Sequence, residues 1–457
     1  MTHIETHIQQ YIIPGRHAHL VGIGGVSMSS LAEVLFQNGM KISGSDWQES
    51  AKVKHLRELG ITIHTGAQEA ENILGADCII RTAAAGDDNP EVAAALAAGI
   101  PVFERAEAWG AIMQRYENAV CIAGTHGKTS TTSMTTHIFM AAQADPTVMI
   151  GGTLPLIGSD YRVGKGDTII LESCEYCNSF HYFFPTIAVV LNVEEDHLDF
   201  FKDLDDIKAS FRRFAALAQQ NGRIVCNADD DNTMDALAGL PVFTFGIERK
   251  ADLRAENLIW DHGMPEFDIV AEGKQYAHLA LKVGGMHSVY NALAAAASAY
   301  LLGIDGNAVK AGLETFTGAG RRFEYRGEFN GAKIYDDYSH HPSELAALFS
   351  MVRSLGYERI VCAFQPHTYT RTKALFGDFV QQLRSVDQVI LAEIFAAREK
   401  NTIGISSRDL AAEIPGAIYC PTLDDVADQL RKTARPGDLI LTVGAGNIVS
   451  VADMLTR

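Results

Sequence analysis

Short apolar runs alternate with longer amphipathic stretches over the first hundred residues. We expect strands at His19–Ile23, Lys41–Ser43, Cys78–Thr82 and Pro101–Phe103. We expect helices at Ser27–Asn38, Ala51–Leu59 and Glu91–Ala98. Strands that alternate with helices in this way predict a parallel sheet with right-handed crossover connections.

The same alternation starts again near Met113 and once more from Arg326. The middle stretch predicts strands Ala119–Ala123, Thr168–Glu172, Ile187–Asn192 and Arg223–Asn227, helices Leu204–Gln220 and Ser288–Leu302, and a β-rich segment Arg254–Val283. The last stretch predicts strands Lys333–Tyr335, Ile360–Phe364, Gln388–Ala392 and Leu439–Val443. We therefore expect three consecutive α/β domains over residues 1–112, 113–318 and 319–457, with Gly318–Gly320 as a candidate hinge.

Composition narrows the class of protein. The 457 residues are 47% apolar and 21% charged, which is ordinary for a globular enzyme. The longest apolar runs have strand length, the N-terminus has no apolar signal core, and seven scattered cysteines fit a reducing compartment. We expect a cytoplasmic protein without a membrane span. A net charge of −18 argues against sequence-independent nucleic-acid binding, which needs basic surface.

A glycine-rich loop with a lysine is the strongest chemical signal. It follows the expected strand Ala119–Ala123, opens a helix, and consists of Gly124, Thr125, His126, Gly127, Lys128, Thr129 and Ser130. Glycines let the backbone wrap a phosphate, the helix N-terminus adds partial positive charge, and the lysine reaches the β- and γ-phosphates. An ordinary helix cap would also use Gly-Lys-Thr, but the strand–loop–helix context favours a bound nucleotide.

Acidic and imidazole side chains follow two of the expected central strands. Glu172 ends one strand, and His197 and Asp199 come just after the next. Ligands of open α/β sheets bind at the carboxyl ends of the strands. Together with a hydroxyl of the loop, these groups suit one or two Mg²⁺ ions, although Glu172 alone is equally consistent with a surface carboxylate.

Weaker signals lie on either side of that loop. Gly22–Ser27 with Asp46 is similar to a dinucleotide fingerprint, and fits NAD, the diphosphate of a nucleotide sugar, or merely a tight turn. The Cys174–Cys177 pair has no partner pair for a zinc site, so an incidental role is favoured. Candidate phosphate or carboxylate clamps are the arginines Arg321, Arg322, Arg371 and Arg398.

Several strings together resemble the Mur ligase family along the whole chain. They are the loops at Gly22–Ser27 and Gly124–Thr129, Glu172–Phe180 (ESCEYCNSF), Asn192–His197 (NVEEDH), His287 with Asn291, Arg321–Glu324 (RRFE), Tyr335–Pro342 (YDDYSHHP), Gln365–Arg371 (QPHTYTR), Ala396–Lys400 (AAREK) and Gly444–Gly446. The resemblance implies a Rossmann-like N-terminal domain, a P-loop-type central ATPase domain and a Rossmann-like C-terminal domain.

The resemblance also implies roles for single residues. Lys128 would bind the ATP phosphates, Thr129 and Glu172 one Mg²⁺, and His197 a second Mg²⁺. His287 and Asn291 would face the adenine, Asp337 the ribose, and Arg322 the γ-phosphate. His340 and Arg371 would lie near the incoming amino acid. The implied residues of the UDP-sugar site are Gly24, Gly25, Ser27, Ser45, Asp46, Arg105 and Ser179.

The reaction implied by the resemblance is ATP-dependent ligation of L-alanine to the lactyl carboxylate of UDP-N-acetylmuramic acid, in peptidoglycan precursor synthesis. Thr368 stands where many alanine-adding members have arginine. This departure weakens the assignment of the residue that binds the carboxylate of the amino acid. The nearest alternative is the sister recycling ligase, which attaches a whole tripeptide. A nicotinamide-dependent oxidoreductase and a nucleotide sensor without ligation are further alternatives, and we expect a monomer or homodimer.

Overall fold

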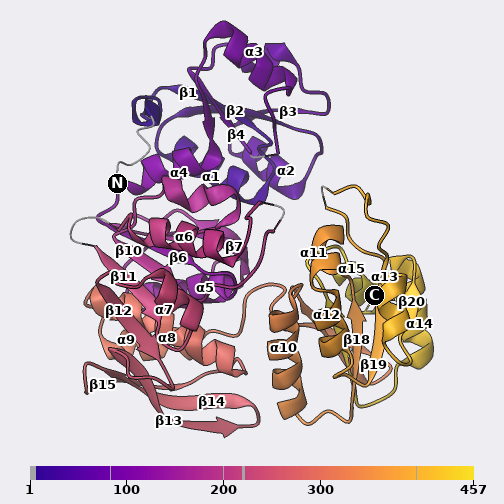
Figure 1. The fold of residues 1–457 in the computed structure, drawn as a ribbon. Coiled ribbons are helices and arrows are strands. Elements are labelled where there is room, and N and C mark those ends of the chain that lie inside the picture. The colour runs from indigo at the N-terminus through magenta and orange to yellow at the C-terminus, as the bar shows by residue number, and fades with distance from the viewer. Residues whose placement is uncertain (1–6, 83, 199, 219–221, 398, 457) are drawn as a thin grey trace.

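The computed structural model describes residues 7–456 except 83, 199, 219–221 and 398. Three α/β units follow one another along the chain, each around its own sheet (Figure 1). The expected class of fold is therefore confirmed. Within the described residues, no helix is both long enough and apolar enough to cross a bilayer.

The N-terminal unit is a five-stranded parallel sheet in the order β3-β2-β1-β4-β5. Its strands are β1 (His17–Val21), β2 (Lys41–Asp46), β3 (Thr62–Thr65), β4 (Cys78–Arg81) and β5 (Val102–Glu104). Its helices are η1 (His7–Gln10), α1 (Val26–Gln37), α2 (Ala51–Glu58), η2 (Ala70–Ile73), α3 (Pro90–Ala98) and α4 (Arg105–Met113). The hydrophobic pattern did not predict β3, because this edge strand is polar and buries one residue in four.

The central unit has a ten-stranded sheet in the order β15-β14-β13-β12-β11-β10-β6-β9-β7-β8. Its strands are β6 (Asn118–Ala123), β7 (Thr147–Leu154), β8 (Ser159–Arg162), β9 (Thr168–Glu172), β10 (Ile187–Val190), β11 (Arg223–Asn227), β12 (Val242–Gly246), β13 (Leu253–Asp261), β14 (Met264–Ala271) and β15 (Lys274–Ala280). Its helices are α5 (Lys128–Ala141), η3 (Tyr176–Tyr182), α6 (Leu204–Ala215), α7 (Asp231–Ala236), α8 (Met286–Leu301) and α9 (Gly306–Leu313). Strands β6, β9 and β10 are almost continuously apolar because helices cover both faces of a parallel sheet.

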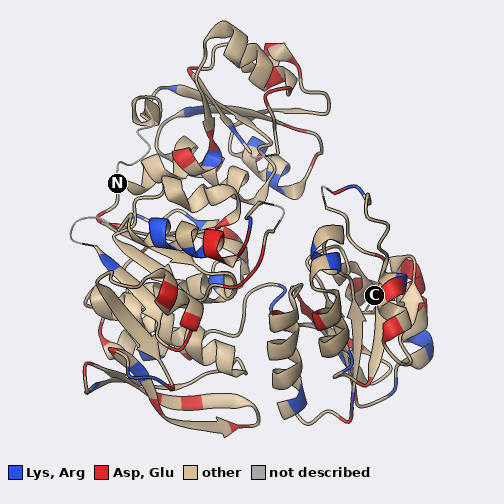
Figure 2. Ribbon diagram, in the orientation of Figure 1, with Lys and Arg blue, Asp and Glu red and all other residues tan. Residues whose placement is uncertain are grey.

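The C-terminal unit is a six-stranded sheet in the order β16-β17-β21-β18-β19-β20, parallel except for the first pair. Its strands are β16 (Glu324–Phe329), β17 (Ala332–Asp337), β18 (Arg359–Phe364), β19 (Gln388–Ala392), β20 (Ile418–Cys420) and β21 (Asp438–Val443). Its helices are α10 (Pro342–Ser354), α11 (Tyr369–Ala374), α12 (Phe376–Leu383), α13 (Ser407–Glu413), α14 (Leu423–Thr433) and α15 (Val449–Thr456). Lysine and arginine are interspersed with acidic residues in all three units (Figure 2).

Helix α4 joins the first unit to the second. Trp109 and Ile112 of this helix are buried in one apolar cluster with Phe180 and Phe211 of the central unit. Gly110 makes the close approach possible, because a Cβ there would lie 2.1 Å from the Tyr182 carbonyl oxygen. The C-terminal unit meets the central one through the charged contacts described below and through Met351 and Leu355, which lie beside Gly284 and Gly263. Figure 1 shows α10 on the side of the C-terminal unit that faces the central unit.

Close packing between α5 and α9 gives a first prediction. A Cβ on Gly312 would lie 2.6 Å from both the Cα and the backbone nitrogen of Ile138, and backbone cannot step aside. Gly312→Ala should destabilise the protein by about 1–3 kcal/mol, measured as a lower Tm. Gly377→Ala is the matched control, because that helical glycine has no neighbour within 4 Å and alanine favours helix by about 1 kcal/mol. Equal Tm values for the two variants would contradict the packing argument.

Candidate functional site

The glycine–lysine loop lies between β6 and α5, as the sequence predicted. Gly124 and Gly127 have positive φ values of 151° and 83°, which glycine adopts without strain. A Cβ on Gly127 would also lie 2.6 Å from the Asn291 Oδ1. The segment after β10 holds the loop in place, because Asn192 accepts the Thr125 N–H through its carbonyl (3.1 Å) and the His126 N–H through Oδ1 (2.8 Å). The loop thus presents the N-terminus of α5 in a fixed shape.

Lys128 is held inside this loop. Its ammonium donates to the carbonyl oxygens of Gly124 (2.5 Å) and Thr125 (3.1 Å), and lies 3.0 Å from both carboxylate oxygens of Glu175. The Glu175 side chain is only 3% exposed. Burial lowers the pKa of Lys128, but the Glu175 carboxylate outweighs burial and raises that pKa above its ordinary value. The lysine is therefore a fixed positive charge whose partner in this structure is a carboxylate.

Oxygen-bearing side chains meet at the next residue of α5, Thr129. The Thr129 hydroxyl donates to the Glu172 Oε2 (2.9 Å), and the Gly151 N–H donates to the same oxygen (2.7 Å). The His197 Nε2 lies 3.8 Å from the Glu175 Oε1, and its ring packs against Tyr176 with centroids 4.8 Å apart. The structure thus brings Thr129 and Glu172 into contact and places His197 beside the partner of Lys128. Asp199 and Arg398 lie outside the described residues.

A cavity of about 770 Å³ opens beside the loop, within the range of small-molecule sites. Seven residues predicted to bind the nucleotide line it: His126, Gly127, Ser130, His287, Asn291, Arg322 and Asp337. Burial lowers the pKa of His287, which favours the neutral form of its ring. The Arg322 guanidinium lies over the Tyr338 ring, 5.0 Å from its centroid. The cavity therefore combines apolar walls with a few polar groups from the central and C-terminal units.

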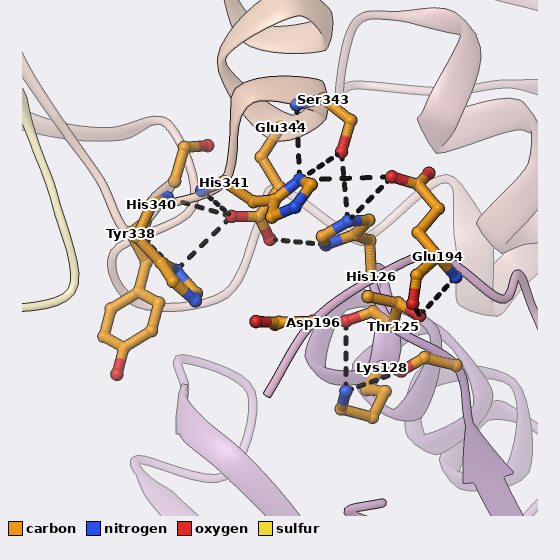
Figure 3. A network of polar contacts seen from close by, with 12 residues as sticks. Thr125, His126, Lys128, Glu194, Asp196, Tyr338, His340, His341, Ser343 and Glu344 are labelled. Carbon is orange, nitrogen blue, oxygen red and sulfur yellow. Dashed lines mark hydrogen bonds and ion pairs between the residues drawn. The ribbon is translucent and has the colours of Figure 1, made fainter. Parts of the chain in front are cut away.

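Charged contacts join the C-terminal unit to the central one around this cavity (Figure 3). The His126 Nδ1 lies 3.1 Å from the Glu344 Oε1, and the Arg371 guanidinium donates twice to the Asp196 Oδ1 (2.6 and 3.1 Å). Burial lowers the pKa of His126, but Glu344 and Glu194 outweigh burial and raise it to about 10. His340 donates its backbone N–H to Glu344 (2.9 Å), and burial lowers its ring pKa to about 4.

The glycine loop of the N-terminal unit follows β1. The Gly24 N–H donates to the Asp46 Oδ2 (2.8 Å), so the acidic residue at the end of β2 closes the turn. The Ser27 hydroxyl accepts from the Trp109 indole (3.2 Å), and the buried Ser45 hydroxyl donates to Glu91 (2.5 Å). The remaining residues implied for this site are Gly25 at the N-cap of α1, Arg105 at the start of α4, and Ser179, whose hydroxyl donates to the Tyr176 carbonyl.

Several residues named from the sequence have structural partners. Arg321 pairs with Asp336 (2.9 Å) and donates to two carbonyl oxygens of the Gly444–Gly446 segment. Asp337 accepts the N–H groups of Phe323 and Ser339, both at 2.8 Å. Within the described residues neither Cys174 nor Cys177 forms a disulfide, and burial raises the pKa of Cys174 to about 11.

Four carboxylates of the site were not predicted as site residues: Glu175, Glu194, Asp196 and Glu344. One sequence signal was available for Glu344. It stands three residues after His341, in the capping-box spacing, and both capping contacts are present in the structure.

Comparisons with known proteins match all three units. Family models described as "Mur ligase family, catalytic domain", "Mur ligase middle domain" and "Mur ligase, glutamate ligase domain" match residues 17–117, 122–299 and 321–446. The chain is 45% identical to the UDP-N-acetylmuramate–L-alanine ligase of Agathobacter rectalis, over 96% of this chain and 98% of that protein. It is 44% identical to the protein of the same name from Acetivibrio thermocellus, with coverages of 97% and 96%.

Solved structures share the architecture. The UDP-N-acetylmuramate-alanine ligase of Thermotoga maritima superposes with a TM-score of 0.80 at 28% identity, covering 96% of this chain and 98% of that one. A murein peptide ligase from Psychrobacter arcticus gives a TM-score of 0.71 at 22% identity, with coverages of 96% and 98%. The second similarity bears on the fold alone.

The Asp196–Arg371 pair gives a prediction for stability. Both side chains are about nine-tenths buried, so Asp196→Asn leaves an uncompensated guanidinium and should cost about 3 kcal/mol, measured as a lower Tm. Asp453→Asn breaks the more exposed Arg326–Asp453 pair and should cost at most about 1 kcal/mol.

The same pair predicts a pH dependence. Burial raises the pKa of Asp196, but Arg371 and then His197 outweigh burial and hold it below its usual range. A depressed carboxylate pKa contributes stability above the unfolded value of about 4, and that stability is lost as the pH falls below it. The Tm difference between wild type and Asp196→Asn should therefore be constant near neutral pH and shrink below about pH 4. A difference that grows with acid would contradict this assignment.

Proposed function

Because this chain belongs to the Mur ligase family, we propose that it uses ATP to join L-alanine to the lactyl carboxylate of UDP-N-acetylmuramic acid. Two relatives above 40% identity over nearly the whole chain carry the name of that reaction. The product is a peptidoglycan precursor, and we place the reaction in the cytoplasm. We also propose that residues 1–112, 113–318 and 319–457 act as three domains.

The observation that carries the proposal is the position of Lys128 beside the cavity. The ammonium lies at the N-terminus of α5, and the cavity next to it is lined by His287, Asn291, Arg322 and Asp337. We assign the purine and ribose to these four residues and the triphosphate to the segment Gly124–Ser130. Backbone N–H groups at a helix N-terminus and a fixed lysine charge are what a triphosphate requires.

The residues present fit Mg²⁺. Thr129 and Glu172 offer hydroxyl and carboxylate oxygens that already lie 2.9 Å apart, and magnesium prefers oxygen ligands. We assign His197 to a second ion. Bound at these residues, magnesium would neutralise phosphate charge. Gly151 belongs to this site as well, because a Cβ there would lie 2.4 Å from the Glu172 Oε1 and would displace the carboxylate.

The positive charges of Lys128 and Arg322 suit the two steps of the proposed ligation. Lys128 and Arg322 would neutralise the γ-phosphoryl group while the lactyl carboxylate attacks it, giving an acyl phosphate and ADP. The neutral amine of L-alanine then attacks the acyl carbon, and the C–O bond to phosphate breaks. We assign Arg371 to the carboxylate of the amino acid and His340 to its surroundings. The contacts of His126 and Arg371 with Glu344 and Asp196 would exclude water from the acyl phosphate.

The UDP-sugar would lie on the N-terminal unit. We assign its diphosphate to the loop that contains Gly24, Gly25 and Ser27, with Ser45, Asp46, Arg105 and Ser179 around the rest of the substrate. In support, this loop follows β1 at the carboxyl edge of a parallel sheet, where such ligands bind.

Replacing Lys128 tests the phosphate site. Lys128→Ala should lower phosphate release in the presence of both acceptors by at least about 100-fold, because a transition-state charge is lost. The single change also leaves the Glu175 carboxylate buried without its ammonium, so Lys128→Ala with Glu175→Gln serves as a variant that keeps the pocket neutral. Wild-type turnover in either folded variant would contradict the assignment.

An acceptor panel tests the substrate. With UDP-N-acetylmuramate present, phosphate release should require L-alanine, and L-alanyl-γ-D-glutamyl-diaminopimelate should not replace it. Release with the tripeptide alone would identify the recycling reaction instead, and release with neither acceptor would reject ligation to this sugar.

A further inference from the structure

Three potential metal ligands meet beside the phosphate loop, apart from Thr129 and Glu172. They are His126 of the loop, Glu194 of the segment after β10, and His341 at the N-cap of α10, and one ligand atom of each lies within 4.8 Å of the others. The Glu194 Oε2 lies 3.4 Å from the His126 Nε2 and 4.0 Å from the His341 Nδ1. Figure 3 shows the two rings and the carboxylate turned toward one another.

In each of the two histidine rings, the nitrogen that faces away from Glu194 already has a hydrogen-bonding partner. The His126 Nδ1 lies 3.1 Å from the Glu344 Oε1, and the His341 Nε2 lies 3.2 Å from the carbonyl oxygen of Glu195. A carbonyl oxygen only accepts, so the His341 Nε2 carries the hydrogen and Nδ1 is left as an acceptor. In this structure Nδ1 accepts from Ser343, and the Glu194 Oε2 lies 4.0 Å away on the same side of the ring. Histidines that bind metals have this arrangement, with the outer N–H on a carboxylate or carbonyl.

We propose that His126, Glu194 and His341 bind a divalent transition metal of the Zn²⁺ class. Two imidazole nitrogens and one carboxylate form a zinc ligand set, whereas Mg²⁺ is bound mainly by oxygen ligands. The Ser343 hydroxyl lies 3.0 Å from the His126 Nε2 and 2.8 Å from the His341 Nδ1, next to the place that a fourth ligand would occupy. The ion replaces the proton that His126 shares with Glu194, as metal binding to histidine generally does.

The proposed ion has a mechanical consequence because its ligands come from two units. His126 and Glu194 belong to the central unit, and His341 begins the first long helix of the C-terminal unit. A bound ion therefore ties the phosphate loop to α10 and holds the two units together. Because substrates must enter and products must leave between them, zinc is expected to slow turnover.

The test measures Zn²⁺ binding to the full-length protein without nucleotide, in excess Mg²⁺, by competition with a chromophoric chelator. Wild type should bind one tight equivalent. His341→Asn should bind at least about 100-fold more weakly, since even loss of an outer-shell partner costs about 10–100-fold. Asparagine is a good N-cap, so α10 keeps its start. Glu194→Gln, which lies outside any helix, is the second ligand variant and should lose the site equally.

Two further variants distinguish a specific metal site from chelation by exposed side chains at the surface. Glu344→Gln should weaken binding by about 10–100-fold without removing a ligand. His278→Asn is the matched control, because His278 also lies near two carboxylates, Glu266 (3.3 Å) and Asp268 (2.9 Å), but is half exposed. Its affinity for Zn²⁺ should equal that of wild type.

Cobalt substitution identifies the ligands. The Co²⁺ protein should show visible bands of a tetrahedral site without the near-ultraviolet thiolate band that Cys174 or Cys177 would add. Wild-type affinity in both folded His341→Asn and Glu194→Gln, or a thiolate band from the tight equivalent, would overturn the proposal. Because no nucleotide or acceptor is present, this result does not depend on the ligase reaction.

Discussion

A buried ammonium needs an anion beside it, and the centre of this molecule is organised by that requirement. Lys128 is fixed by two carbonyl oxygens of its own loop and by the carboxylate of Glu175. Desolvation of an unpaired charge costs several kcal/mol, so any ligand that draws the lysine away from Glu175 must itself be strongly anionic. A triphosphate meets that condition. The neighbouring His197 Nε2 lies 3.8 Å from the Glu175 Oε1.

Contacts of the same kind join the C-terminal unit to the central one. The first and second units share an apolar cluster through α4, which makes them one continuous core. The third unit contacts the second through two charged pairs, His126 with Glu344 and Arg371 with Asp196. The apolar side chains of Met351 and Leu355 also lie against the central unit, beside Gly284 and Gly263. When the units separate, both charges of each pair become hydrated together and neither is left buried alone, so this junction suits a site that opens and closes. The residues that would bind nucleotide and amino acid thus also determine how the units meet.

The sequence predicted the parts of the site that depend on local chemistry. The segment Gly124–Ser130 was recognisable because glycines and a lysine between a strand and a helix favour a bound phosphate over an ordinary helix cap. Glu175 and Glu344 were not predicted as site residues, because their importance comes from partners 47 and 218 residues away in the chain. Among the strands, β7 was missed because Gly151 and Gly152 interrupt its apolar alternation, although the first of them leaves room for the Glu172 carboxylate.

The central claim is that the γ-phosphoryl group of an ATP bound beside Lys128 is transferred to a carboxylate. UDP-N-acetylmuramate labelled with ¹⁸O in its lactyl carboxylate tests it most directly, with the released inorganic phosphate analysed by mass spectrometry. Attack of the carboxylate on the γ-phosphorus and later cleavage of the acyl C–O bond would carry one labelled oxygen into phosphate at every turnover. Phosphate without label, whether or not an amide product forms, would contradict the account.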